Sequence, residues 1–201
     1  ISLGNTHQDG IISSTGMDRY NVKVSADTKL TNNWSSGFTA NYITTSIDKA
    51  VTSGNGLLRT VYAAPPSYDL AGIPSHVDGN PYTQNSFRGS FDNAYWAMEN
   101  NKFTEDTNRF FGNVYTSYQT DFGTTNHKLN AKYMVGVDAY TTHYVDSYGY
   151  GSNTGGGRGQ IENYGWTNAT YNSLLTINYD WHINEDWGLN AVVGNEIIQS
   201  L

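Results

Sequence analysis

Four side chains that could bind a sugar occupy every second position of one stretch in the second half of the chain. They are Asp138, Tyr140, Thr142 and Tyr144. Carbohydrate recognition combines contact with an apolar ring face and hydrogen bonds, and tyrosine and aspartate side chains supply both. We predict that these four residues contact a substrate. The alternative is that they only hydrate the surface they line, or pack against another part of the protein.

Residues with catalytic or metal-binding chemistry are not arranged for either task. The histidines are far apart in the sequence and form no H-E-x-x-H motif: His7, His76, His127, His143 and His182. The glycine-rich run at 155–159 lacks the lysine and the serine or threonine of a phosphate-binding loop. No G-x-S-x-G nucleophile motif occurs. The sequence therefore predicts a protein that is not an enzyme and that uses no cofactor or metal.

The four candidate residues belong to a long predicted strand, Lys128–Tyr144. One set of alternate positions is apolar from Leu129 to Ala139, whereas the other set is polar and includes Lys132 and Asp138. Successive side chains of a strand point to opposite faces, so this pattern predicts one apolar and one polar face. The length is unusual, because strands of globular proteins mostly have about 5–6 residues.

The same alternation recurs along most of the chain. It predicts further strands within residues 1–12, 20–30, 34–42, 110–118, 169–181 and 189–197, which makes about seven strands with the one above. Short polar connections at 31–33, 121–126 and 183–186 predict tight turns between consecutive strands. The predicted sheet is antiparallel and runs up and down.

Two connections are longer. Residues 48–106 contain all four prolines and no sustained period of two, and residues 56–64 could form one or two helical turns before Pro65. The aromatic side chains of this segment indicate that it packs into a folded loop. Residues 149–163 are rich in glycine and predict a flexible loop. The long connections thus fall at one end of the predicted sheet. The tight turns at the other end lie beside Trp34, Phe122, Trp181 and Trp187.

Composition alone permits two fold classes. Charged residues make up only 14% of the chain, which has 16 tyrosines and 21 glycines. A transmembrane β-barrel has such a composition, with short turns at one end, long loops at the other and aromatic residues at the interfaces. The alternative is a secreted, soluble β-sandwich that binds glycans. The separation of long and short connections favours the barrel, because a sandwich has no reason to gather its long loops at one end.

Other features restrict the partners and the extent of the chain. The net charge of −7 argues against nucleic acid as a partner, and the absence of cysteine excludes disulfides. Closed bacterial barrels have an even number of strands, from 8 upward, and unpaired strand edges are costly in lipid. We therefore expect this chain to be a fragment of a larger barrel. The start at Ile1, with no signal peptide visible, agrees with that expectation.

Several short motifs resemble the SusC/RagA family of TonB-dependent outer-membrane transporters of Bacteroidota. They span essentially the whole chain in the family's order: Gln8–Ile12 with Arg19–Asn21, Leu58–Arg59 with Ala63–Pro65, Gly79–Tyr82, Glu105–Asn113, and Tyr171–Leu175 with Trp187–Leu189. The resemblance implies a plugged transmembrane barrel of about 22 strands, of which residues 1–201 would supply about seven. The plug domain and the closing strands would lie outside this chain.

The resemblance also implies a location and a set of partners. The location is the bacterial outer membrane, and the transported substrates are oligosaccharides or peptides. The partners are a SusD-like surface lipoprotein that covers the extracellular loops, the TonB–ExbB–ExbD energy system, the remaining barrel and plug polypeptide, and membrane lipid or lipopolysaccharide. Loop tyrosines that could contact the lipoprotein, or could instead pack within their own loops, are Tyr62, Tyr68, Tyr148 and Tyr150.

Overall fold

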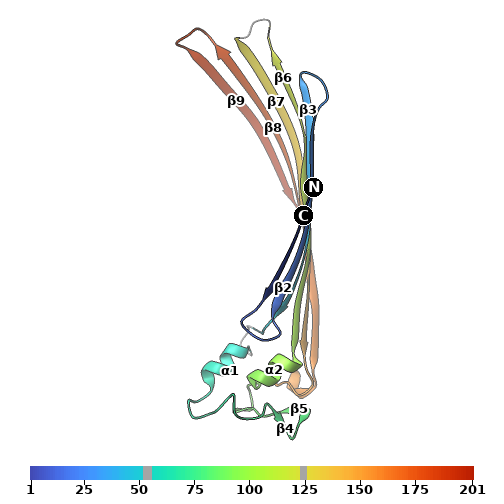
Figure 1. Ribbon diagram of the computed structural model, residues 1–201, viewed down its shortest axis with the longest axis vertical. Coiled ribbons are helices and arrows are strands. Elements are labelled where there is room, and N and C mark those ends of the chain that lie inside the picture. The colour runs from blue at the N-terminus through green and yellow to red at the C-terminus, as the bar shows by residue number, and fades with distance from the viewer. Residues whose placement is uncertain (52–55, 123–125) are drawn as a thin grey trace.

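The main element of the fold is one seven-stranded antiparallel sheet (Figure 1). The computed structural model describes residues 1–51, 56–122 and 126–201. The prediction of an antiparallel all-β fold is confirmed. The strands pair in chain order: β1 (Ser2–Asp9), β2 (Gly16–Lys29), β3 (Trp34–Lys49), β6 (Lys102–Asp121), β7 (His127–Tyr148), β8 (Gln160–His182) and β9 (Gly188–Ser200).

The alternation of side chains explains why these segments form this sheet. The registers of β7 with β6 and with β8 advance residue by residue along its length, so that Val135 lies opposite Val114 on one side and Ser173 on the other. Directly opposed residues of antiparallel strands share a face. A shift of one residue would move every apolar side chain of a strand to the polar face, so the alternation fixes the register.

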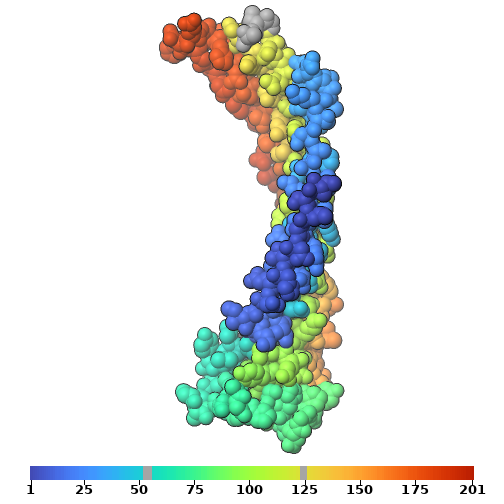
Figure 2. All heavy atoms as spheres, viewed as in Figure 1, coloured from blue at the N-terminus to red at the C-terminus, as the bar shows by residue number. Residues whose placement is uncertain are grey.

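The described sheet is open and has a single layer. In the part of the chain that the structure describes, β1 pairs only with β2 and β9 only with β8, so these strands do not close a barrel. The remaining described strands, β4 (His76–Val77) and β5 (Asn80–Gln84), form a small separate hairpin in the segment of sequence that connects β3 to β6. Figure 2 shows the thin sheet extending from a bulkier end.

The long strands continue further into the connections than the sequence predicts. β3 ends at Lys49 and β6 begins at Lys102, so the predicted loop 48–106 shortens to 50–101. β8 begins at Gln160, so the predicted loop 149–163 shortens to 149–159. In these strand ends polar side chains occupy both faces. Hydrophobic alternation therefore disappears, although backbone pairing continues.

The connection between β3 and β6 folds into a unit that we call the insert (residues 56–101). Its first helix, α1 (Leu57–Ala63), confirms the predicted helical turns before Pro65, whereas α2 (Ala94–Asn100) and the β4–β5 hairpin were not predicted. Trp96 of α2 is fully buried, and the other buried apolar residues of the described chain are Phe91, Ala94 and Phe103. The apolar core therefore lies in and beside the insert.

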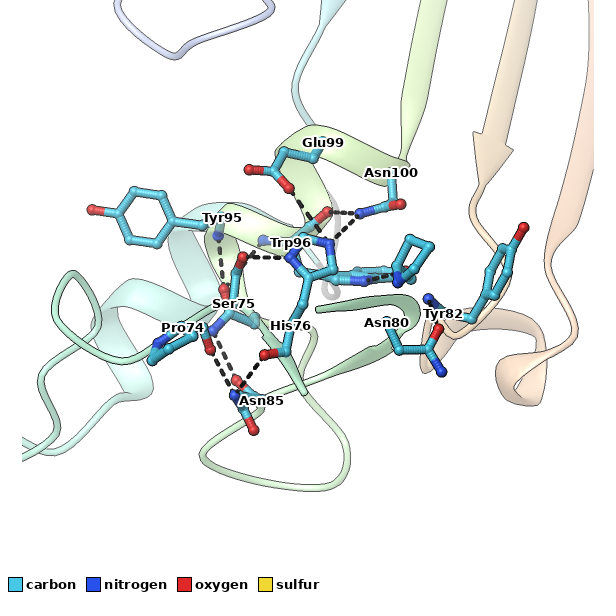
Figure 3. Close-up of polar contacts among 12 residues, drawn as sticks. Pro74, Ser75, His76, Asn80, Tyr82, Asn85, Tyr95, Trp96, Glu99 and Asn100 are labelled. Carbon is cyan, nitrogen blue, oxygen red and sulfur yellow. Dashed lines mark hydrogen bonds and ion pairs between the residues drawn. The ribbon is translucent and has the colours of Figure 1, made fainter. Parts of the chain in front are cut away.

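Polar contacts hold the insert around Trp96 (Figure 3). The Asn93 side chain accepts hydrogen bonds from the backbone N–H groups of Tyr95 and Trp96, at 2.9 and 3.2 Å, and so begins α2. The Trp96 indole N–H donates to the Pro81 carbonyl at 2.8 Å. His76 Nε2 lies 3.5 Å from Glu99 Oε2 at the other end of α2. The helix is thereby fixed against the hairpin.

A buried carboxylate joins the insert to the connection between β7 and β8. Asp92 accepts hydrogen bonds from the Ser152 hydroxyl at 2.6 Å, from the Asn153 backbone N–H at 2.7 Å and from the Gln84 amide at 2.8 Å. The run predicted to be a flexible loop forms a tight, irregular turn, Thr154–Gly157. Its three glycines have positive φ angles, which side chains disfavour. The two connections therefore fold as one body.

The opposite end of the sheet has the tight turns (Figure 1). Leu30–Asn33 joins β2 to β3 with a hydrogen bond from the Leu30 N–H to the Trp34 carbonyl at 2.8 Å. A similar bond, from Ile183 to Trp187 at 2.9 Å, closes the turn between β8 and β9. The predicted turn at 121–126 lies partly outside the described residues. In the described ranges, no helix has the length and apolar character needed to cross a membrane.

Candidate binding surface

The two faces of the sheet differ in chemistry. We call the face onto which Val135 projects the apolar face and the face onto which Met134 projects the polar face. The registers carry each face across all seven strands without interruption. Tyr62, Tyr68 and Tyr150 lie in the connections and belong to neither face.

The apolar face carries a band without charged side chains. On β7 this band runs from Leu129 to Ala139, a strand length of about 33 Å at about 3.3 Å per residue. Val114 and Val193, both within it, are 59% and 69% exposed. Other exposed apolar side chains of the band are Val22, Phe38, Tyr42, Phe110, Tyr133, Tyr171, Leu175, Ile177 and Ile197. The band thus presents a broad apolar surface to its surroundings.

Charged residues on the apolar face lie only nearer the insert, beyond the band. They are Asp9, Asp18, Asp48, Lys102 and Asp106 among the described strand residues. On β7 the same zone carries Thr141 and His143. The face therefore changes from apolar to polar at a defined row, which contains Tyr42, Phe110 and Ala139.

The polar face carries most of the charged and amide side chains of the strands, beside a few apolar ones such as Val192 and Ile198 of β9, and holds its own network. The Tyr115 hydroxyl donates to Asp27 Oδ1 at 2.6 Å, although β3 lies between their strands. Gly37 of β3 lies between the two side chains and leaves them room to meet. Lys132 Nζ lies 4.4 Å from the centre of the Tyr115 ring. This arrangement ties four strands together on one face.

The structure places all four predicted substrate residues on the polar face, but three of them already have partners. Asp138 accepts from Arg109 Nε at 2.8 Å and pairs with the guanidinium through both of its oxygens. Thr142 is buried, and its hydroxyl lies 3.0 Å from that of Thr107. Tyr144 packs against neighbouring aromatic rings, and both it and Tyr140 remain partly exposed. Contacts within the sheet therefore engage most of the predicted group.

Tyr144 belongs to a cluster of aromatic rings that we call the aromatic shelf (Tyr144, Tyr164 and Trp166). Tyr144 and Tyr164 face each other across β7 and β8, with ring centres 5.0 Å apart and planes 9° from parallel. Trp166 follows along β8, with its ring centre 5.1 Å from that of Tyr144. The shelf lies on the polar face, in the rows between the end of the apolar band and the insert.

Charged groups border the shelf. Lys49 Nζ lies 4.4 Å from the centre of the Tyr144 ring and 3.1 Å from Glu105 Oε2. The Tyr164 hydroxyl donates to Asp146 Oδ2 at 3.1 Å. A phenol with a usual pKa of about 10 is protonated at neutral pH, so the hydroxyl groups of the shelf tyrosines can donate hydrogen bonds.

A hollow of about 700 Å³ opens beside the shelf. Tyr164, Asp146, Tyr148 and Phe103 line one side, and the turn between β1 and β2, from Gln8 to Ile12, lines the other. β1 and β8 are not neighbours in the sheet, so a hollow that both border requires the sheet to curve around it. Binding sites for small molecules usually measure about 300–1,000 Å³, so the hollow has ample room for a ligand.

The four loop tyrosines do not behave alike. Tyr62 on α1 and Tyr150 are exposed, and Tyr150 packs edge-on against Tyr82 with ring centres 5.5 Å apart. Tyr68 packs against Phe87 within the insert, and Tyr148 against Phe103 at the base of the connection. Tyr62 and Tyr150 thus remain accessible to a partner.

Sequence reasoning missed Tyr164, Trp166 and Arg109. The predicted loop 149–163 and the predicted strand beginning near residue 168 left the two aromatic residues between elements. The available signal was the spacing of two from Glu162 through Tyr164 and Trp166 to Asn168, which continues the polar face. Arg109 had no such signal, because its partner Asp138 lies on another strand.

The described residues provide no centre for metal chemistry. Within 1–51, 56–122 and 126–201, no group of three or more histidine, aspartate or glutamate side chains could hold a metal ion. The arrangement can bind and orient a ligand through stacking, hydrogen bonds and charge. No protein-family model matches the chain, and no curated protein matches it either.

Proposed function

We propose that this chain forms part of the wall of a transmembrane β-barrel in the bacterial outer membrane. The apolar face contacts lipid, and the polar face lines a water-filled interior. The charge-free band carries this proposal. Strands tilted by about 40° give a band of about 33 Å an apolar height of about 25 Å, which is the height of the lipid-facing zone of such barrels.

The energetics of the exposed band support the same assignment. Apolar surface in water costs about 25 cal/mol for each Å² that could be buried, so a broad band of valine, leucine, isoleucine and aromatic side chains needs an apolar neighbour. A soluble sandwich would provide a second sheet, and the described chain places no second sheet against the band. Lipid provides the neighbour without one.

The unpaired edges of the sheet also bear on the proposal, because they need further strands as partners. The outer edges of β1 and β9 carry backbone groups without strand partners in the described chain. Such groups are costly in hydrocarbon, so further strands of the remaining barrel polypeptide pair with them. In this arrangement the tight turns face the periplasm, and the insert faces the outside of the cell.

Within this barrel we place the transport function that the motif resemblance implies. The protein takes up oligosaccharides or peptides, with energy from the TonB–ExbB–ExbD system. A SusD-like lipoprotein covers the insert, where Tyr62 and Tyr150 are exposed. The wide polar face, with its hydroxyl, amide and charged groups, supports passage of a hydrophilic solute.

Single spin labels along β7 test the lipid-facing assignment. Residues 1–201 contain no cysteine, so each introduced cysteine is the only labelling site within them, and any cysteine elsewhere in the polypeptide is first replaced by serine. In outer membranes, labels at Leu129, Val135 and Ala139 should be accessible to oxygen, which partitions into lipid. Labels at Asn130, Met134 and Asp138 should be accessible to a water-soluble nickel chelate.

The zone beyond the band gives this experiment an internal control. A label at Thr141 lies on the apolar face but outside the band, so the nickel chelate should reach it. If labels at Leu129, Val135 and Ala139 are shielded from both reagents, these side chains face a dry protein interior. The barrel assignment then fails, and the soluble sandwich takes its place.

Transport is tested separately in living cells. Depletion of TonB should abolish uptake of the oligosaccharide or peptide pool on which the cells grow, because import needs energy. Binding of the same pool at the cell surface should persist. Uptake that continues without TonB would contradict energised import and would leave the barrel assignment intact.

A further inference from the structure

The aromatic shelf exposes ring surface on the polar face, among charged side chains. Tyr164 and Trp166 are 42% and 50% exposed. Aromatic residues that serve only to stabilise a fold gain most when their large surface is buried. Tyr144 stacks on Tyr164 and lies under the ammonium group of Lys49, so it supports the cluster while Tyr164 and Trp166 supply the exposed ring surface. This exposed surface suits the apolar face of a ligand ring.

The charges around the shelf restrict the ligand. The carboxylates of Glu105, Asp146 and Glu162 border it, together with the single ammonium group of Lys49, which already pairs with Glu105. An anionic ligand would be repelled by this surplus of negative charge. Hydroxyl groups of a neutral ligand can instead donate hydrogen bonds to carboxylate oxygens.

The backbone argues against a peptide at this position. Along the shelf, the backbone groups of β7 pair with β6 and β8 and point within the plane of the sheet. A peptide lying on the polar face would therefore gain no hydrogen bonds from the backbone of the sheet, which is what usually holds an extended peptide on a strand. The six-membered ring of a sugar has an apolar C–H face and hydroxyl groups at its rim, which match the rings and the carboxylates.

We propose that the aromatic shelf is a binding subsite for an uncharged pyranose unit of an oligosaccharide. The ring stacks on the exposed aromatic surface, and its hydroxyl groups donate to the bordering carboxylates. The hollow of about 700 Å³ beside Tyr164 receives the adjoining sugar units. This inference rests on the proposed function only in requiring that the polar face line a water-filled interior.

Calorimetric titration of the purified protein, as its own cells make it, tests the subsite. The probes are maltohexaose, mannohexaose and xylohexaose as neutral sugars, hexagalacturonate as an anionic sugar and hexaalanine as a peptide. At least one neutral hexasaccharide should bind. Hexagalacturonate and hexaalanine should bind at least about tenfold more weakly than the best neutral sugar.

Substitutions then locate the binding. Trp166→Ala and Tyr164→Ala should each weaken binding of the best neutral sugar by about tenfold, the usual worth of one stacking contact. Trp166→Phe keeps an aromatic ring and should retain most of the affinity, which separates lost stacking from a folding defect. Tyr133→Ala is the matched control, because Tyr133 lies on the neighbouring strand but on the apolar face. It should leave the affinity unchanged.

Three results would overturn the subsite. They are equal or tighter binding of hexagalacturonate or hexaalanine, unchanged affinity after Trp166→Ala, and failure of all three neutral hexasaccharides to bind at millimolar concentration. None of them alters the lipid and water accessibility along β7, so the barrel proposal would survive. Failure of the spin-label experiment would instead remove the barrel, whatever the sugars do.

Discussion

At the scale of single residues, Gly37 determines how the polar face is connected. Tyr115 reaches across β3 to Asp27 only because position 37 has no side chain. A Cβ atom at this position would lie 2.7 Å from Cε1 of Tyr115 and would also collide with the Asp27 carboxylate. One absent methyl group therefore permits a hydrogen bond between strands that are not neighbours in the sheet.

Gly37→Ala should destabilise the protein by about 1–3 kcal/mol, because overpacking forces neighbouring side chains to shift. The measurement is the urea midpoint of unfolding in detergent micelles. Gly194→Ala is the control, since its Cβ would make an ordinary contact of 3.5 Å with the Leu175 carbonyl. The double variant Gly37→Ala, Tyr115→Ala should recover part of the loss. Equal effects of Gly37→Ala and Gly194→Ala would show that the contact of Tyr115 with Asp27 across β3 does not contribute to stability.

At the scale of elements, the Asp92 carboxylate helps to join the insert and the connection between β7 and β8 into one folded body. Asp92 follows the β4–β5 hairpin and directly precedes α2, and its partners Ser152 and Asn153 lie in the connection between β7 and β8. Asp92 and Ser152 are both buried. Buried donors that lose their acceptor cost about 1–3 kcal/mol each, so Asp92 contributes strongly to the docking of the insert. The Gln84 amide, which also donates to the Gly151 carbonyl at 2.9 Å, and the contact of Tyr82 with Tyr150 support the same docking.

Asp92→Ala should therefore release the insert and leave the sheet intact. Limited trypsin digestion of outer membranes measures this, because Arg59 and Arg88 within the insert should become cleavage sites several times faster than in the natural protein. Glu99→Ala serves as control, since Glu99 is largely exposed and its contact with His76 at 3.5 Å lies within the insert, so its loss leaves the links from the insert to the β7–β8 connection in place. Unchanged digestion in Asp92→Ala would mean that other contacts hold the insert.

The elements also show where sequence reasoning succeeds and where it stops. Alternation predicts the seven strands because one face of each strand is apolar, and Pro65 predicts the end of α1. It loses the ends of β3 and β6 that fall within the predicted loop 48–106, because the hydrophobic alternation stops there while backbone pairing continues. It also loses the contact of Asp92 with Ser152, because hydrogen bonds between distant loops leave no periodic signal. The aromatic shelf was found only in part for the same reasons.

At the scale of the whole molecule, the band and the polar face divide the sheet between two solvents. Val135 and Met134 are adjacent in sequence, occupy the same strand and project to opposite sides. Any difference between identical substitutions at these positions therefore reports the solvent on each side. The pair tests the assignment independently of any ligand or label.

Val135→Lys should strongly reduce the amount of folded protein in outer membranes, whereas Met134→Lys should be tolerated. A lysine on the lipid side near the middle of the bilayer costs about 2–4 kcal/mol, and one on the water-filled side costs little. The fraction of protein that migrates as a folded species before heating measures the effect. Equal losses for both variants would contradict a division between lipid and water.

The pairing order of the strands has a consequence for the route of assembly. Within β1–β3 and within β6–β9, each strand pairs with its neighbour in the chain. The connections inside these two groups are short, except for the β7–β8 connection of residues 149–159. Only the pairing of β3 with β6 must wait for the ends of segment 50–101 to meet, and longer loops close at greater entropic cost. We expect β1–β3 and β6–β9 to form two sheets independently, and these sheets to join last, when β3 pairs with β6. A protein cut within the insert should then still reassemble from its two halves.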